Sequence, residues 1–301
     1  MTAQAPTTGD RVASKLKDYA RNAKVDTPQF VQRFAQERLA VRLFSLPEAD
    51  TLMLNGGTMY YWSPDTNDIH RSTSDIDVKS FVSLSHGTIE DLVRKAAAVA
   101  IDDGVEIEVG KSEALKHEGL EQPGLRVHVV VKIGTMRSAG HLDFSIGSEP
   151  AMGTRMLTPN PVVKGQPVVP IRSQQWIYSI AEKLHTICKF GIDNTRMKDY
   201  RDLLVLARKG YGKHPDLPAA IVEVFDERRT LLPGVIPAGL DLMFAQYRQQ
   251  DWESYLAKLS PRQREGLPTD LSDVTSALED AYVPALVPEE ELEFATGARY
   301  A

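Results

Sequence analysis

The sequence predicts an α+β fold in two lobes, the first over residues 1–165 and the second over residues 166–301. Strand patterns, in which apolar side chains occupy every second position, occur before residue 147 together with helical segments. Residues 147–170 contain five prolines, so we expect no regular element there and a hinge between the lobes. After this segment, apolar residues recur at helical spacing, which predicts a helical second lobe.

The composition is that of a globular protein with a sizeable core. Apolar residues make up 42% of the chain and charged residues 25%, both close to the averages for globular domains. The net charge of −6 argues against a uniformly basic nucleic-acid-binding protein. The single cysteine, Cys188, excludes an internal disulfide and fits a reducing compartment. The N-terminus lacks the apolar core of a signal peptide and no apolar run is long enough to span a bilayer, so we expect a cytoplasmic protein without a membrane partner.

Two segments have a local excess of positive charge. Residues 10–45 carry eight basic and four acidic residues, and residues 172–213 carry nine basic and four acidic residues. For the first segment, the simpler interpretation is a helix face that points to solvent. The more specific interpretation is a contact with the phosphate backbone of a nucleic acid. Together the two segments weakly favour a polyanionic partner. The basic residues of the first segment are Arg11, Lys15, Lys17, Arg21, Lys24, Arg33, Arg38 and Arg42.

A glycine turn precedes a pair of carboxylates in the first lobe. Gly56 and Gly57 follow a short apolar run, and Thr58 opens an expected helix directly after them. Free backbone N–H groups at such a turn suit the phosphates of a nucleotide. Asp75 and Asp77 stand two residues apart in a short strand, so both face one side and their apolar neighbours face the other. Two acids on one face repel each other unless a cation lies between them, and a divalent metal with oxygen ligands is the usual solution.

A third carboxylate is expected beside this pair. Residues 89–100 predict a helix, residues 105–109 and 125–133 predict strands, and His141–Ile146 follows as a further strand. Asp143 has apolar neighbours on both sides, so in a strand it turns to the opposite face. If this strand is adjacent to the one that carries Asp75 and Asp77, then Asp143 is a third metal ligand. The alternative is an exposed strand aspartate.

The second lobe adds charged candidates on helices. Asp199 and Asp202 stand at positions i and i+3, so they share one helix face. Lys183 lies near the middle of an earlier helix whose apolar face consists of Ile177, Ile180, Leu184 and Ile187. Farther along the chain, the expected core residues are Phe225, Trp252, Tyr255 and Leu256, and the chain ends in an acidic segment at residues 289–293.

Together these motifs resemble the AbiEii nucleotidyltransferase toxin family, which includes the MenT toxins of mycobacteria. The resemblance begins at Arg38, runs through nearly the whole chain and is most specific in residues 181–206. It implies a nucleotidyltransferase-like mixed β-sheet flanked by helices, followed by a helical C-terminal lobe. It also implies a toxin that is paired with an antitoxin protein. Some MenT proteins add nucleotides to the 3′ end of tRNA.

The resemblance implies roles for individual positions. Many relatives have a serine second in the phosphate turn, where this chain has Gly57, and we choose Thr58 as the hydroxyl that contacts a phosphate. Asp75 and Asp77 match the family's metal pair, and the strand pattern adds Asp143, so the expected metal ligands are Asp75, Asp77 and Asp143. With Gly56 and Gly57 matching the phosphate turn and Lys183 the helix lysine, the expected nucleotide-binding residues are Gly56, Gly57, Thr58, Lys183 and Arg196. Asp199 and Asp202 match the acids of the later helix, and the expected catalytic residues are Asp75, Asp77, Asp143, Lys183, Asp199 and Asp202.

We therefore expect a Mg²⁺-dependent enzyme, with Mn²⁺ as an alternative ion, that uses a nucleoside triphosphate (NTP) as substrate. It would transfer a nucleoside monophosphate to RNA and release pyrophosphate, with the 3′ end of tRNA as the first candidate acceptor. Lys183 would pair with the triphosphate, or else is a surface lysine paired with a carboxylate. Asp199 or Asp202 would orient Lys183 or Arg196. The alternatives are transfer of a nucleotidyl or phosphoryl group to a protein or small molecule, and a nucleotide-binding relative without catalysis.

Overall fold

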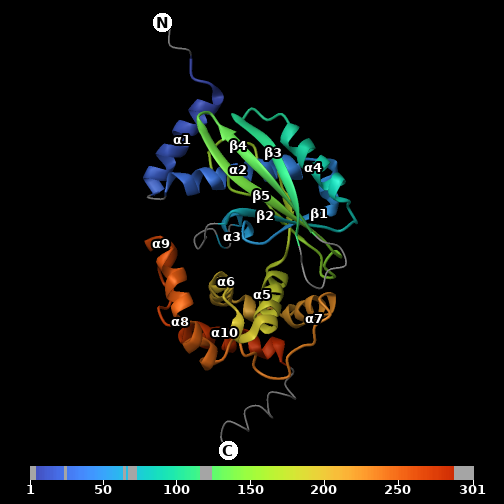
Figure 1. Ribbon diagram of the computed structural model, residues 1–301, viewed down its shortest axis with the longest axis vertical. Helices are drawn as coiled ribbons and strands as arrows, with labels where there is room; N and C mark the ends of the chain where they lie inside the picture. Colours follow the sequence, from blue (N-terminus) through green and yellow to red (C-terminus); the bar gives the residue numbers. More distant parts are fainter. Residues whose placement is uncertain (1–4, 24–25, 64–65, 67–72, 116–123, 288–301) are drawn as a thin grey trace, which may run out of the picture. The chain divides into compact units, whose positions relative to one another are not determined.

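The computed structural model describes residues 5–23, 26–63, 66, 73–115 and 124–287. The chain forms two compact units, Met1–Gln174 and Gln175–Ala301. The strands of the described residues belong to the first unit, and the second unit is helical (Figure 1). The predicted α+β class, with a mixed sheet flanked by helices and a helical C-terminal part, is confirmed. The predicted lobe boundary after residue 165 stays a prediction, and Lys24 and the acidic segment at residues 289–293 lie outside the described residues.

The first unit begins with two helices, α1 (Thr8–Ala23) and α2 (Thr27–Phe44). A 3-10 helix η1 (Pro47–Thr51) and a single-turn helix α3 (Met59–Trp62) follow, the latter directly after the glycine turn. Helix α4 (His86–Ala98) starts before the predicted residue 89. Its early start has a local cause, because the Ser85 hydroxyl caps the helix by accepting a hydrogen bond from the backbone N–H of Thr88 at 3.1 Å.

Within the described residues, seven strands form one mixed sheet in the order β3-β4-β5-β2-β1-β7-β6. Strands β2 and β5 are parallel, as are β1 and β7, while the other neighbours are antiparallel. The strands are β1 (Leu52–Asn55), β2 (Asp75–Ser80), β3 (Val105–Leu115), β4 (Gly124–Ile133), β5 (Met136–Ile146), β6 (Arg155–Leu157) and β7 (Ile171–Ser173).

Strand β6 corrects the prediction that no regular element runs through residues 147–170. Its three residues lie between Pro150 and Pro159 and contain no proline themselves. They pair antiparallel with β7. The strand therefore exists because of a partner farther along the chain, which the local proline content does not reveal.

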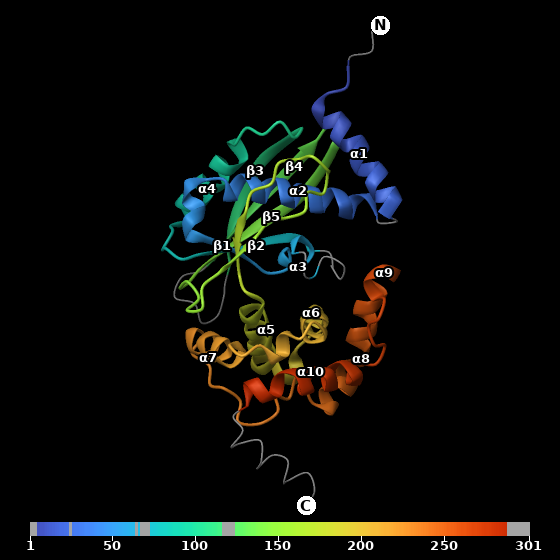
Figure 2. The ribbon, with the colours of Figure 1, turned by 180° about the vertical axis from the view of Figure 1, so that it is seen from behind.

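One face of the sheet is apolar and is covered by helices. Ile76 and Val78 of β2 and Leu142 and Phe144 of β5 are at most 1% exposed and point to this face. Figures 1 and 2 show the unit from opposite sides, with α2 crossing the strands. Helices α1 and α2 pack on β4 through a cluster that includes Leu16, Phe34 and Ile133. The polar side chains of β2, β4 and β5 are consequently left on the other face.

A buried ionic cluster anchors α2 in the first unit. We define the α2 ionic cluster as Glu37, Arg38, Arg42 and Asp103, whose side chains are at most 2% exposed. Arg42 donates to both carboxylate oxygens of Asp103, at 2.7 and 2.8 Å. Arg38 donates to Glu37 at 2.7 Å, and both residues also bond to the backbone of residues 162–167. The cluster ties α2 to two segments that are far away in sequence.

The α2 ionic cluster shows that both interpretations of the first basic segment are wrong for Arg38 and Arg42. Their guanidinium groups contact neither water nor a phosphate backbone, because Glu37 and Asp103 neutralise them inside the unit. The sequence could not show this, since Asp103 is 61 residues away from Arg42. Among the described residues of this segment, the exposed basic side chains are instead those of α1, namely Arg11, Lys15, Lys17 and Arg21.

The second unit packs its helices around an apolar core. The predicted apolar face of α5 (Trp176–Phe190) is confirmed, because Ile177, Ile180, Leu184 and Ile187 are buried. Of the other predicted core residues, Phe225, Trp252 and Leu256 are buried but Tyr255 is half-buried, because its ring packs beside Trp252 at the edge of the core. None of the helices in the described part of the chain is long and apolar enough to cross a membrane. The remaining elements are η2 (Gly191–Asp193), α6 (Met197–Arg208), η3 (Tyr211–Lys213), α7 (Leu217–Glu227), α8 (Leu242–Ala257), α9 (Pro261–Arg264) and α10 (Leu271–Leu286).

The α2 ionic cluster generates a stability prediction. Asp103→Asn removes the carboxylate that faces Arg42 and leaves a buried guanidinium without its counter-charge. Breaking a buried pair in this way costs about 3–5 kcal/mol, so we expect the free energy of unfolding to fall by that amount in denaturant titrations. Asp102→Asn is the matched control, because the same change at this exposed neighbour should alter stability by less than about 0.5 kcal/mol. Equal losses in the two variants would contradict the prediction.

Candidate functional site

The candidate site in the first unit depends on the pairing of β2 with β5. The two strands are parallel, with Asp75 opposite His141 and Asp77 opposite Asp143. In β2, half-buried and buried residues alternate, so both aspartates lie on the face opposite to Ile76. The adjacency on which the prediction for Asp143 depended is therefore present, and its carboxylate shares a face with the other two.

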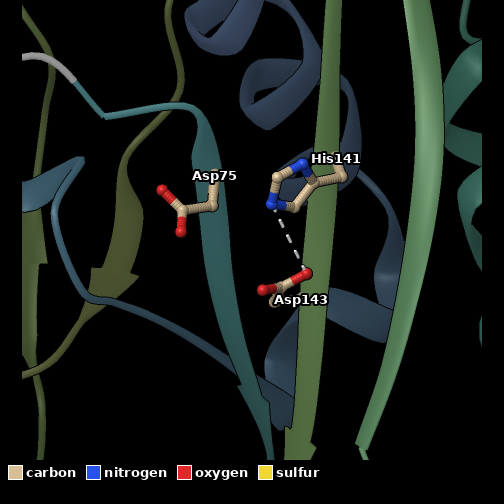
Figure 3. Close-up of side chains that lie close together, drawn as sticks. All are labelled: Asp75, His141 and Asp143. Carbon is tan, nitrogen blue, oxygen red and sulfur yellow. Dashed lines mark ion pairs between the residues drawn. The ribbon is translucent and has the colours of Figure 1, made fainter. Parts of the chain in front are cut away.

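Three side chains on this face are close enough to bind one ion. Ligand atoms of Asp75, His141 and Asp143 all lie within 4.8 Å of one another. Figure 3 shows Asp75 on β2 and the other two residues on β5, with Nε2 of His141 3.8 Å from Oδ1 of Asp143. The side chains of His141 and Asp143 are 15% and 14% exposed. The hydroxyl of Thr73 donates to the Asp75 carboxylate.

His141 was missed in the sequence, although the signal that identified Asp143 also applies to it. It stands two residues before Asp143 and therefore faces the same side of β5. Its Nε2 atom is buried and makes no hydrogen bond within the described residues. Burial lowers the pKa of His141, and the nearby charge of Arg126 adds to this while that of Asp143 opposes it. A neutral imidazole has a lone pair that a cation can use.

Asp77 lies directly against the glycine turn. Asn55, the last residue of β1, is the register partner of Asp77. Gly56 has φ +71°, and a Cβ atom there would lie 1.8 Å from Oδ2 of Asp77. Glycine is therefore required at position 56 both by the left-handed backbone and by the neighbouring carboxylate. The turn and the acid, 21 residues apart in sequence, form one structural feature.

The region after the turn is more enclosed than the sequence suggested. Thr58 is fully buried, and its hydroxyl has no hydrogen-bond partner in the described part of the chain. The side-chain oxygen of Asn55 is likewise buried and without a partner there. Helix α3 has four residues, so its dipole is small and any phosphate contact at this turn would depend on individual N–H groups. The predicted contacts of Gly57 and Thr58 with phosphate stay predictions.

Arg126 of β4, the register partner of Asp143, was also missed in the sequence. Its Nε and Nη2 atoms donate to the two carboxylate oxygens of Asp143 at 2.8 and 2.6 Å. This contact raises the pKa of Arg126, while burial opposes the change. The alternating pattern of residues 125–133 indicated that alternate side chains point away from the core, but it could not show that one of them reaches Asp143.

The remaining predicted site residues form a network inside the second unit. Nζ of Lys183 lies 2.7 Å from Oδ1 of Asp199 and 3.1 Å from Oδ2 of Asp202. Nε of Arg196 donates to the other oxygen of Asp199 at 2.7 Å. Burial raises the pKa of Asp199, but the charges of Lys183 and Arg196 outweigh it and hold the pKa well below the usual range.

The network separates the two acids, which the sequence could not distinguish. Asp199 joins Lys183 to Arg196, whereas Asp202 contacts Lys183 and lies 3.8 Å from Arg201. Both carboxylates are at most 2% exposed, while the Lys183 side chain is 14% exposed. The ammonium group of Lys183 is therefore held by two buried carboxylates. This network belongs to the second unit, whereas Asp75, His141 and Asp143 belong to the first.

Comparison with known proteins identifies one matching family. The profile of the nucleotidyl transferase AbiEii toxin family, of type IV toxin–antitoxin systems, matches residues 38–282. Among solved structures, JHP933 from Helicobacter pylori is similar, with a TM-score of 0.50 and 16% identity over 91% of this chain and 98% of that chain. A second solved structure from H. pylori, described as a putative nucleotidyltransferase, has a TM-score of 0.48 and 18% identity over 88% of this chain and 97% of that chain. No curated protein sequence matches significantly.

The contact between Gly56 and Asp77 generates a prediction with a matched control. Gly56 and Gly153 have φ values of +71° and +73°, so alanine strains the backbone at both positions in the same way. Nothing lies within 4 Å of a Cβ at Gly153, whereas a Cβ at Gly56 collides with Asp77. We therefore expect Gly56→Ala to lower the free energy of unfolding by at least about 1 kcal/mol more than Gly153→Ala in denaturant titrations. Similar decreases in the free energy of unfolding of both variants would show that the Asp77 side chain does not pack closely against Gly56.

Proposed function

We propose a reaction for this chain from one premise: it belongs to the AbiEii family, the nucleotidyltransferase toxins of type IV toxin–antitoxin systems. The family implies an NTP substrate, a divalent metal ion and an antitoxin partner. We infer that the chain transfers a nucleoside monophosphate from an NTP to RNA. The first candidate acceptor is the 3′ end of tRNA, as in some MenT toxins. The observation that carries the proposal is the group of Asp75, His141 and Asp143 on the face where Asp77 meets the glycine turn.

The residues at this face fit a divalent ion. Two carboxylates offer the oxygen ligands that Mg²⁺ prefers, and the imidazole of His141 also suits Mn²⁺. The ligand atom of this imidazole is the buried Nε2, which makes no hydrogen bond within the described residues. We propose that Asp75, Asp143 and His141 hold the ion, with Asp77 as the additional carboxylate from the predicted set. When bound, the ion would offset the negative charge of the triphosphate and of the acids around it.

The other residues have proposed roles toward the nucleotide. Gly56 and Gly57 would leave their N–H groups accessible to phosphate oxygens, with Thr58 contributing its hydroxyl. Lys183 would pair with the triphosphate as a point charge, and Asp199 and Asp202 would hold it in position. Arg196, whose side chain is 51% exposed, would be a second cation for the same substrate.

The proposed chemistry is an in-line displacement at the α-phosphorus. The acceptor hydroxyl oxygen forms a bond to the α-phosphorus, and the bond from this phosphorus to the β-phosphate oxygen breaks. Pyrophosphate leaves with the electron pair of that bond. Asp143 is the proposed base that accepts the hydroxyl proton, which then passes to solvent.

An RNA acceptor is supported by exposed positive charge. Arg11, Lys15, Lys17 and Arg21 are exposed on α1, where they are accessible to phosphates. Arg38 and Arg42 no longer count toward this argument, since both are buried and paired. A toxin that uses NTP and RNA would act in the cytoplasm, where both are present. The alternatives are transfer to a protein or small molecule, and nucleotide binding without turnover.

A labelling experiment tests the reaction. The protein is incubated with Mg²⁺, total RNA and each of the four α-³²P nucleoside triphosphates in turn. We expect label in small RNA with at least one nucleotide, and a loss of at least about 100-fold in Asp77→Ala, because a missing catalytic group typically costs that much. Asp91→Ala, which removes an exposed carboxylate on α4, is the control that should retain activity.

The outcomes separate the alternatives. Label in protein, or no label in RNA, would overturn the RNA assignment. Tight binding of an NTP in calorimetry, with no product from any acceptor, would instead indicate a relative without turnover.

A further inference from the structure

Arg126 is in direct contact with a carboxylate that we assign to the metal. Its guanidinium binds both oxygens of Asp143, at 2.8 and 2.6 Å, in the parallel two-bond geometry that arginine and carboxylate prefer. The contact is cross-strand, from β4 to β5, on the face that carries Asp75 and His141. Because the two residues are register partners, the sheet itself holds the positive charge beside the candidate ion site.

The surroundings of Arg126 distinguish this pair from an ordinary surface ion pair. Asp143 is 14% exposed and Arg126 is 29% exposed, so water screens the pair only in part. On its other side, Arg126 is the register partner of Glu113 in β3. The Glu113 carboxylate itself binds Nε2 of His128 at 2.8 Å. Of its two acidic register partners, Arg126 makes the bidentate contact with Asp143 and not with Glu113.

A cation in this position must oppose a second cation on the same carboxylate. Two positive charges held on one carboxylate repel each other even in a medium like water, and more strongly where water is partly excluded. The repulsion is twice as large when one of the two charges is a divalent ion. The ion pair also occupies lone pairs of Asp143 that a metal would otherwise use.

We propose that Arg126 is a built-in counter-cation that holds Asp143 in the absence of metal and keeps the affinity of the site for a divalent ion alone low. This inference rests on the proposed metal site. A triphosphate brings negative charge that offsets the repulsion. Each of the two ligands, the metal ion and the NTP, therefore raises the affinity of the site for the other. Loading of the site with metal is thereby tied to the arrival of the substrate.

The test measures Mn²⁺ binding directly, by the loss of the electron paramagnetic resonance signal of free Mn²⁺, with the full chain and no nucleotide. We expect Arg126→Met to bind Mn²⁺ about tenfold more tightly than the unmodified chain, because the repelling charge is gone. Arg126→Lys keeps the charge and should stay within about threefold of the unmodified chain. Arg94→Met is the matched control, since it removes an exposed arginine paired with Glu90 and Asp91 on α4, and should leave Mn²⁺ binding unchanged.

A second set of measurements separates this inference from the metal site on which it rests. Asp143→Asn should weaken Mn²⁺ binding both alone and with NTP, and thermal unfolding shows that each variant is folded. If Asp143→Asn weakens binding but Arg126→Met binds Mn²⁺ no more tightly than the unmodified chain, the role of Arg126 is overturned and the metal site stands. If Mn²⁺ binds neither the unmodified chain nor Arg126→Met, with or without NTP, the metal site and the inference both fail.

Discussion

The parallel register of β2 and β5 is the constraint on which the candidate site depends. It sets Asp75 opposite His141 and Asp77 opposite Asp143, so four potential ligands share one face of the sheet. The opposite face carries side chains such as Ile76 that are buried under helices. A slip of one residue in β2 would bury its acids and expose its apolar residues, so the hydrophobic core and the polar face select the same register.

In each unit, a basic side chain is bound to acidic side chains of the same unit. On the sheet, acids are in excess and a cation, Arg126, is bound to one of them. In the second unit, one lysine, Lys183, is shared by the buried acids Asp199 and Asp202.

Helix α2 links the stability of the first unit to the geometry of the site. The α2 ionic cluster fixes the helix from within the unit, through Arg42 and Asp103. On the same helix, the Gln36 side chain donates to the backbone carbonyls of Thr73 and Asp75, at 3.0 and 3.4 Å. The start of β2 is therefore held by a helix whose own position depends on buried charges. Because a buried ion pair is costly to break, this support is rigid.

The sequence by itself determined what local patterns determine: the α+β class, the alternation in β2, the apolar face of α5 and the grouping of Asp199 with Asp202 on one helix face. Only the tertiary structure decided which strands are neighbours, and therefore that His141 and Arg126 join Asp143 and that Arg38 and Arg42 are buried. Periodicity assigns a side chain to a face within one element. The residue that a side chain meets on the neighbouring strand is set by packing between segments that are far apart in sequence. Local patterns in a single sequence do not specify that pairing.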